Sequence, residues 1–108
     1  MQVEGSYLLA RTLKEEGVDH LFFLMGGPNY EIINNSEDLG IRAVDFRHEQ
    51  AASMAAHGYA RVTGKPGVTT AASGPGTLNL LTGQYTAWSD CAPMITLGGA
   101  GPIEDFGR

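Results

Sequence analysis

The stretch from Ile41 to Ala72, IRAVDFRHEQAASMAAHGYARVTGKPGVTTAA, decides the fold of this chain. It opens with a short apolar run, residues 41–46, that predicts a buried strand. An Ala-rich segment then predicts a helix from His48 to about Thr63, which ends at Gly64. Residues 67–72 predict the next strand. Two strands and a helix joined by short turns favour a right-handed crossover between parallel strands.

Elsewhere the chain repeats this alternation of helical and extended patterns. The fold class is therefore α/β, a doubly wound and mostly parallel sheet with helices on both faces. About four strands are present, where such sheets have about five or six, so residues 1–108 are interpreted as one partial N-terminal domain without a second domain. The remaining elements are expected as helices over residues 6–16, 28–34 and 77–88, strands over residues 20–24 and 93–97, and a polar connection over residues 34–40.

Composition restricts the partners and the compartment. The 108 residues include 7 Lys and Arg against 12 Asp and Glu, for a net charge of −5. Such a chain has no basic field for a phosphate backbone or an anionic membrane, so we expect neither nucleic acid nor a membrane as a partner. The single Cys91 has no partner for an internal disulfide, and we expect it to be a small buried residue. A reducing compartment, the cytoplasm, is the expected location.

Several motifs follow one another along the chain. They are the pair Gly26-Gly27, the triplet His48-Glu49-Gln50, the segment AAHGYARVTGKPGV at residues 55–68, the turn SGPGTLN at residues 73–79, and Pro-Met-Ile at residues 93–95. Together they resemble the pyrimidine-binding domain of thiamine-diphosphate enzymes. Within that family, the group of acetolactate synthase, benzaldehyde lyase, oxalyl-CoA decarboxylase and the 2-hydroxyacyl-CoA lyases is the most similar.

The resemblance implies an activity for a larger parent enzyme. That enzyme would make or cleave a carbon-carbon bond adjacent to a carbonyl, in a 2-keto acid or a 2-hydroxyacyl-CoA, as a lyase, transferase or decarboxylase. It would be a homodimer or homotetramer whose cofactor lies against a second subunit. Thiamine diphosphate and Mg²⁺ are the implied cofactors, with the Mg²⁺ held by a domain absent from this chain, so we expect no metal ligand here. The alternative is an inactive truncated module that keeps only the dimerisation and pyrimidine-side surface.

Glu49 is the residue to which the resemblance assigns the central role. It would contact a ring nitrogen of the cofactor's aminopyrimidine and exchange a proton with it. That role requires proton exchange near neutral pH, which an apolar surrounding favours, whereas the helix dipole at a first turn favours the carboxylate anion. Taken without the motif, Glu49 also fits an ordinary acid in the first turn of a helix.

The other candidate residues are also implied by the resemblance. Pro75 and Asn79 would lie near the pyrimidine ring and bind the cofactor. Gly26 and Gly27 would let the backbone approach the substrate side. His48, beside the acid, either contacts substrate or is a partly buried polar residue without a chemical task.

The helix expected over residues 48–63 is rich in small side chains. These allow a close approach of another backbone, which fits either a subunit interface or an ordinary helix buried under its own sheet. His57, on this helix, is expected in packing or at an interface. Before the Gly26-Gly27 pair, the apolar residues 23–25 depart from the lead-in that is usual in acetolactate synthases. This departure favours a lyase or decarboxylase, or else these residues only fill the core at the end of a strand.

Overall fold

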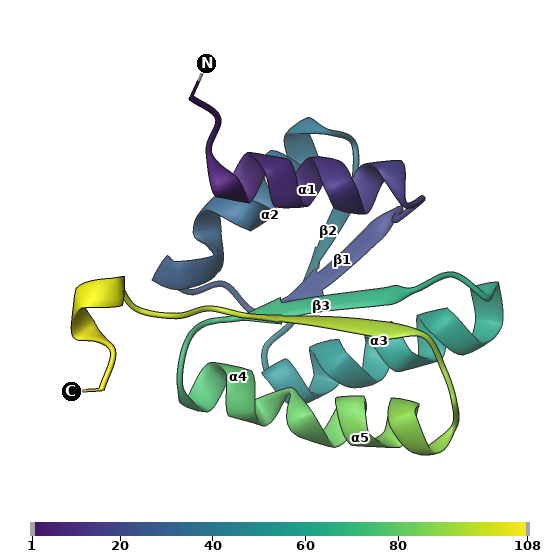
Figure 1. Cartoon of the computed structure of the whole chain (residues 1–108). Coiled ribbons are helices and arrows are strands. Elements are labelled where there is room, and N and C mark those ends of the chain that lie inside the picture. Colours follow the sequence, from purple (N-terminus) through teal and green to yellow (C-terminus); the bar gives the residue numbers. More distant parts are fainter. Residues whose placement is uncertain (1, 108) are drawn as a thin grey trace.

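A four-stranded parallel sheet forms the centre of the molecule, seen in a computed structural model that describes residues 2–107 (Figure 1). The strands lie in the order β2-β1-β3-β4, and each neighbouring pair is parallel. The α/β fold class expected from the alternating pattern is confirmed. The strands are β1 (His20–Phe23), β2 (Arg42–Asp45), β3 (Gly67–Ala71) and β4 (Met94–Gly98).

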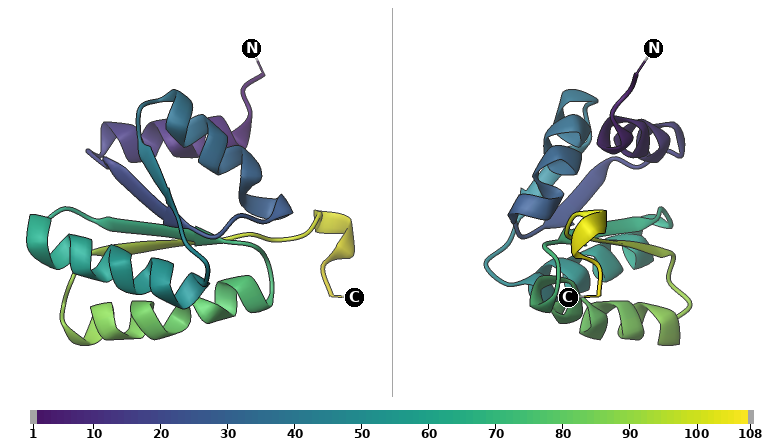
Figure 2. Two further views of the ribbon diagram at one scale, coloured as in Figure 1. Left: turned by 180° about the vertical axis from the view of Figure 1, so that it is seen from behind. Right: turned by 60° about the vertical axis from the view of Figure 1, so that its left-hand side comes forward.

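Helices cover both faces of this sheet (Figures 1 and 2). On one face, Leu21 and Val68 of the strands pack against α1 and α2. On the other, Phe22 packs against Ala52 and Ala56 of α3, and α5 lies beside α3. The sheet is therefore doubly wound, as expected. The helices are α1 (Gly5–Glu15), α2 (Tyr30–Asp38), α3 (Glu49–Thr63), α4 (Pro75–Asn79) and α5 (Leu81–Ser89), with short 3-10 turns η1 (Gly27–Asn29) and η2 (Ile103–Asp105).

The second helix is longer than its sequence suggests. It was expected to end near residue 34, but α2 continues to Asp38, and the expected polar connection is mostly helical. The side chain of Ser36 is fully buried, and Asn35 Nδ2 donates to Ser6 Oγ of α1 at 3.0 Å. These contacts with the rest of the fold outweigh the preference of Asn and Ser for turns.

The segment expected as one helix over residues 77–88 is two helices. The first, α4, begins two residues earlier, with Pro75 at its first position, where proline's fixed φ is compatible with a helix. The break falls at Leu80, whose side chain is fully buried and whose N–H bonds to the Thr77 carbonyl three residues back, at 3.1 Å. Burial of Leu80 tightens the chain at this point, and Asn79 consequently ends a short helix of its own.

Glycine residues in β3 and α5 let α3 pack closely against both of these elements. A Cβ atom at Gly67 of β3 would overlap the Ala56 carbonyl, and one at Gly83 of α5 would overlap Ser53. Ser53 is fully buried, as is Ala56. Of the two interpretations of the small residues, burial against the sheet and a neighbouring helix is confirmed, whereas a subunit interface on this helix stays a prediction.

Replacing Gly83 with Ala is expected to lower the free energy of unfolding by about 1–3 kcal/mol, because the added methyl group overpacks the contact with Ser53. The matched control is Gly58→Ala on α3, where a Cβ meets nothing within 4 Å. There alanine is expected to raise the free energy of unfolding by about 0.5–1 kcal/mol through its higher helix propensity. Urea denaturation measures both, and an equal effect of the two substitutions would contradict the close packing.

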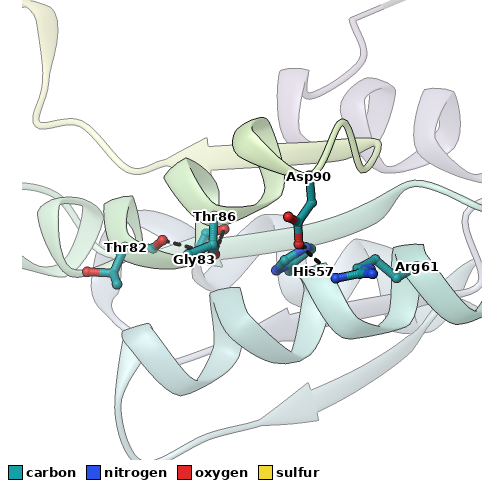
Figure 3. Close-up of polar contacts among 6 residues, drawn as sticks. All are labelled: His57, Arg61, Thr82, Gly83, Thr86 and Asp90. Carbon is teal, nitrogen blue, oxygen red and sulfur yellow. Dashed lines mark hydrogen bonds and ion pairs between the residues drawn. The ribbon is translucent and has the colours of Figure 1, made fainter.

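Polar side chains connect α3 to the end of α5 (Figure 3). Arg61 Nη1 lies 2.8 Å from Asp90 Oδ2, and His57 Nε2 lies 3.1 Å from the same oxygen. The imidazole contact lacks hydrogen-bond geometry, so the arginine supplies the directional bond. As a largely exposed ion pair it contributes about 0.2–1 kcal/mol. His57 is mostly buried between the helices, which agrees with packing as its role.

Cys91, in the turn after α5, corrects an expectation. It was expected to be buried, but it is exposed, and its φ of 53° places it in the left-handed region. Its N–H bonds to the Trp88 carbonyl at 3.0 Å, which closes the end of the helix and turns the side chain out of the core. The sequence pattern did not indicate this turn, because the left-handed position is usually occupied by Gly or Asn.

Candidate active site

The carboxyl edge of the sheet is where the predicted site residues collect. From β1 the chain moves outward through α2 to β2, then returns through α3 to β3 on the other side of β1 (Figure 1). In doubly wound sheets, ligands bind at the point where the strand order reverses in this way, beyond the carboxyl ends of the strands. The loops after β1 and β3 meet at that point.

Glu49 and Asn79 form a direct contact at this edge. Glu49 is the first residue of α3, and Asn79 is the last residue of α4. Asn79 Nδ2 donates to Glu49 Oε2 at 3.1 Å. The other oxygen, Oε1, lies next to bare backbone, because a Cβ at Gly76 would be 3.4 Å from it. The half-buried carboxylate thus has one oxygen held by an amide and the other beside a glycine.

His48 caps the N-terminus of α3, the helix that begins with Glu49. It is the N-cap residue of α3, with an extended backbone, and its Nδ1 accepts the Gln50 backbone N–H at 3.0 Å. This bond satisfies one of the unpaired donors at the start of the helix. The side chain is exposed. The structure therefore gives His48 a capping role that the sequence did not indicate, and contact with substrate stays a prediction.

The turn after β3 is held rigidly beside Glu49. Gly74 has a φ of 63°, a conformation that side chains other than glycine's rarely adopt. Pro75 follows as the first residue of α4, and a Cβ at Gly76 would lie 3.3 Å from the Ala72 methyl group. The Thr77 hydroxyl donates to the Ala72 carbonyl at 2.7 Å. Pro75 thus directs the start of the short helix that ends at Asn79.

The loop after β1, residues 24–28 (the β1 loop), carries the two predicted glycines. A Cβ at Gly26 would overlap the Ala72 methyl group, whereas one at Gly27 would meet nothing within 4 Å. The loop is closed by Asn29, whose Oδ1 accepts the Gly26 N–H at 2.8 Å and whose Nδ2 donates to the Leu24 carbonyl at 3.2 Å. Asn29 was not among the predicted site residues. An asparagine that follows a Gly-Gly-Pro turn was its only sequence signal.

The predicted residues therefore fall into two groups. Glu49, Asn79 and Pro75 belong to one unit formed by the start of α3 and the short helix α4, and His48 lies beside Glu49 as the N-cap of α3. Gly26 and Gly27 belong to the β1 loop, and Gly26 packs against Ala72, which in turn lies next to Gly76.

The donors and acceptors at Glu49 fit an aminopyrimidine better than they fit a metal. A carboxylate, a side-chain amide and accessible backbone can pair with the donors and acceptors of a heteroaromatic ring. Within residues 2–107, no group of three or more His, Cys, Asp or Glu side chains is placed to hold a metal ion. Over the same residues, no helix has the length and apolar character needed to cross a bilayer.

Two hollows lie away from Glu49 and Asn79, although the first is lined in part by Pro28 and Asn29 of the β1 region. One, of about 210 Å³, lies between α1, η1 and the end of β4, and the other, of about 270 Å³, lies on the outer side of α5. Neither is lined by Glu49 or Asn79. We place the candidate site at Glu49 because a carboxylate with a fixed hydrogen-bond donor at the switch point has a chemical capability that volume alone does not supply.

The sequence of this chain matches a known protein family. Residues 3–108 match the family described as thiamine pyrophosphate enzyme, N-terminal TPP binding domain. An acetolactate synthase of Arthrospira platensis is 44% identical over 98% of this chain and 19% of its own length. A 2-hydroxyacyl-CoA lyase of Arabidopsis thaliana is 38% identical over 98% of this chain and 18% of its own length. The chain thus spans less than a fifth of these curated relatives, and it belongs to the thiamine pyrophosphate enzyme family, matching the N-terminal TPP-binding domain.

Proposed function

We propose that this chain is the N-terminal domain of a thiamine-diphosphate-dependent enzyme that makes or cleaves a carbon-carbon bond adjacent to a carbonyl. The observation that carries the proposal is the Glu49 carboxylate, held by Asn79 at the switch point of the sheet. Family membership supports the cofactor. Relatives named acetolactate synthase and 2-hydroxyacyl-CoA lyase support acetolactate-synthase-like chemistry on a 2-keto acid or a 2-hydroxyacyl-CoA.

The residues of this chain would bind and orient the pyrimidine side of the cofactor. Thiamine diphosphate, when bound, supplies the reactive carbon and accepts the electrons of the broken bond. Glu49 would hold a proton and exchange it with a pyrimidine ring nitrogen. The amide of Asn79 occupies Oε2 and leaves Oε1 for that exchange. Pro75 and Gly76 would keep the backbone beside the ring rigid and free of side-chain bulk.

A second subunit of the same protein is the proposed partner at this site. Leu78, Leu81, Tyr85 and Trp88 form a stripe along α4 and α5, with exposed fractions of 63%, 51%, 73% and 81%. An apolar helix face of this kind marks an interaction surface. The stripe begins next to Asn79, so a subunit that covers it would also close the site. We propose a homodimer or homotetramer in the cytoplasm, with the diphosphate and Mg²⁺ held by residues outside this chain.

The alternative function is a non-catalytic module that keeps only this assembly surface and the pyrimidine side. The exposed stripe favours it equally, because the stripe needs no cofactor to bind a partner. The two functions differ in whether the chain acts together with a diphosphate-binding domain.

Calorimetry and turnover assays distinguish these functions. Titrating the 108-residue chain with thiamine diphosphate and Mg²⁺ is expected to give no saturable heat, because this chain supplies only the pyrimidine side. Submicromolar binding would contradict that division of the site.

The full-length protein that carries this chain is expected to turn over a 2-keto acid or a 2-hydroxyacyl-CoA. It should lose that activity when the cofactor is removed and regain it when the cofactor is restored. A folded full-length protein with no cofactor-dependent turnover of either class would refute the enzyme proposal and favour the module.

A further inference from the structure

We propose that Asn29 is a positioning residue that sets the distance between the β1 loop and Glu49. The inference rests on the function proposed above and adds a residue to that site. Asn29 is buried, with 1% of its surface exposed, and it is the last residue of η1. It touches neither Glu49 nor Asn79 through any hydrogen bond among residues 2–107, so its effect on the site would pass through the backbone.

Asn29 closes the β1 loop by three hydrogen bonds. Its Oδ1 accepts the Gly26 N–H at 2.8 Å, its Nδ2 donates to the Leu24 carbonyl at 3.2 Å, and its own backbone N–H bonds to the Gly26 carbonyl at 3.2 Å. A primary amide is both a donor and an acceptor, so one side chain satisfies opposite needs of the same loop. Because these groups are partly buried, removing the amide would leave them without partners, and the loop would have to rearrange.

A chain of close contacts leads from this loop to the acid. Gly26 is pressed against Ala72, so closely that no side chain fits between them. A Cβ at Gly76 would be 3.3 Å from the Ala72 methyl group and 3.4 Å from Glu49 Oε1. The Thr77 hydroxyl fixes the Ala72 carbonyl at 2.7 Å. The β1 loop therefore packs against the same turn that lies beside the acid.

The β1 loop also contacts the turn after β4. A Cβ at Gly99 would lie 2.6 Å from Pro28 Cβ and 3.1 Å from the Ser73 backbone nitrogen. The Gly99 N–H bonds to the Ala71 carbonyl at 3.0 Å. The loops after three strands thus pack closely against one another at glycine positions, and Asn29 is the side chain that fixes the shape of the first loop.

Two residues of the β1 loop, Met25 and Gly27, face solvent and are held in place by these contacts. Met25 is 53% exposed, and a Cβ at Gly27 would enter open space. If Asn29 is lost, Met25 and Gly27 move relative to Glu49, while the bond between Glu49 and Asn79 stays in place. Substrate binding and alignment would therefore suffer, whereas proton exchange on the cofactor would not.

The test compares Asn29→Ala with Asn35→Ala in the full-length enzyme. Asn35 is the control, because it is an asparagine on the neighbouring helix whose amide makes a hydrogen bond away from the β1 loop, to Ser6 Oγ. For Asn29→Ala we expect kcat/KM for substrate to fall about 10- to 100-fold, as misplacement by about 1 Å does. The half-saturating thiamine diphosphate concentration and the exchange rate of the thiazolium proton are expected to stay within about twofold.

Unchanged substrate kinetics, or a parallel fall in proton exchange, would overturn the inference. If Asn29→Ala does not fold, amide hydrogen exchange of the unsubstituted protein decides instead. The Gly26 amide is expected to exchange as slowly as the amides of β1, and exchange at the rate of an exposed loop would overturn the proposed clamp. An enzyme without any thiamine-diphosphate-dependent turnover would refute the proposed function, and this result is separate from the protection of the Gly26 amide.

Discussion

Glu49→Gln is expected to slow exchange of the thiazolium proton of bound thiamine diphosphate by about 10²- to 10⁴-fold, the range typical of general acid-base catalysis. Glutamine has nearly the size of glutamate, and its carbonyl can still accept the Asn79 amide, so the packing at the start of α3 should survive. What it loses is the ionisable proton. Deuterium exchange of the cofactor in the full-length enzyme, followed by acid quenching and NMR, measures the rate.

The control for this substitution is Glu37→Gln on α2, an exposed carboxylate on the opposite face of the sheet. It makes the same change in charge without touching the site, so exchange should proceed at the unsubstituted rate. Circular dichroism and the half-saturating cofactor concentration establish that both variants are folded and loaded. Near-normal exchange in Glu49→Gln would refute the role assigned to the acid.

Gly26→Ala is expected to be the most damaging substitution in the β1 loop. The new methyl group would overlap that of Ala72, which directly follows β3 and cannot move aside without moving the strand. Overpacking of this kind costs about 1–3 kcal/mol of unfolding free energy. A loop displaced by about 1 Å lowers kcat/KM for substrate by about 100-fold. The effect is steric, because Gly26 has an extended backbone, with φ −152°, that any residue can adopt.

Gly27→Ala provides the matched comparison one residue along the chain. Here the methyl group meets nothing within 4 Å, so the free energy of unfolding should change by less than about 0.5 kcal/mol. Urea denaturation and substrate kinetics, measured side by side, separate the two variants. Equal stability of the two would show that Gly26 does not hold the loop against Ala72.

The sequence predicts the class of this fold because its signals are local. The apolar runs, the Ala-rich helix and the Gly64 stop in Ile41–Ala72 are each contained within a few residues. The predicted helix boundaries are wrong where contacts between residues distant in sequence determine where a helix ends. The extension of α2 depends on Asn35 meeting Ser6, and the break at Leu80 depends on burial of that side chain. Neither contact is visible in the spacing of residues along the chain.

In the candidate site, too, the sequence predicts individual residues but not the contacts between them. Motif resemblance names Glu49 and Asn79 separately, but their hydrogen bond joins positions 30 residues apart and requires the crossover through β3. His48 was interpreted by its chemistry, whereas its position as N-cap decides its bonds. Asn29 was missed because an asparagine after a Gly-Gly-Pro turn usually faces solvent. Only the assembled loop shows that its side chain is buried.

The close packing of α3 between Gly67 and Gly83 couples the orientation of this helix to the position of Glu49, its first residue. Ala56, the residue that faces Gly67, is seven positions from Glu49, about 10 Å along the helix axis. A helix of this length behaves as a rigid rod, so a side chain added at either glycine would tilt the whole rod and carry the carboxylate with it. Positions packed against α3 one to two helical turns from Glu49 are therefore expected to affect the proposed activity, and directed evolution of the proposed enzyme should sample them alongside the residues around Glu49.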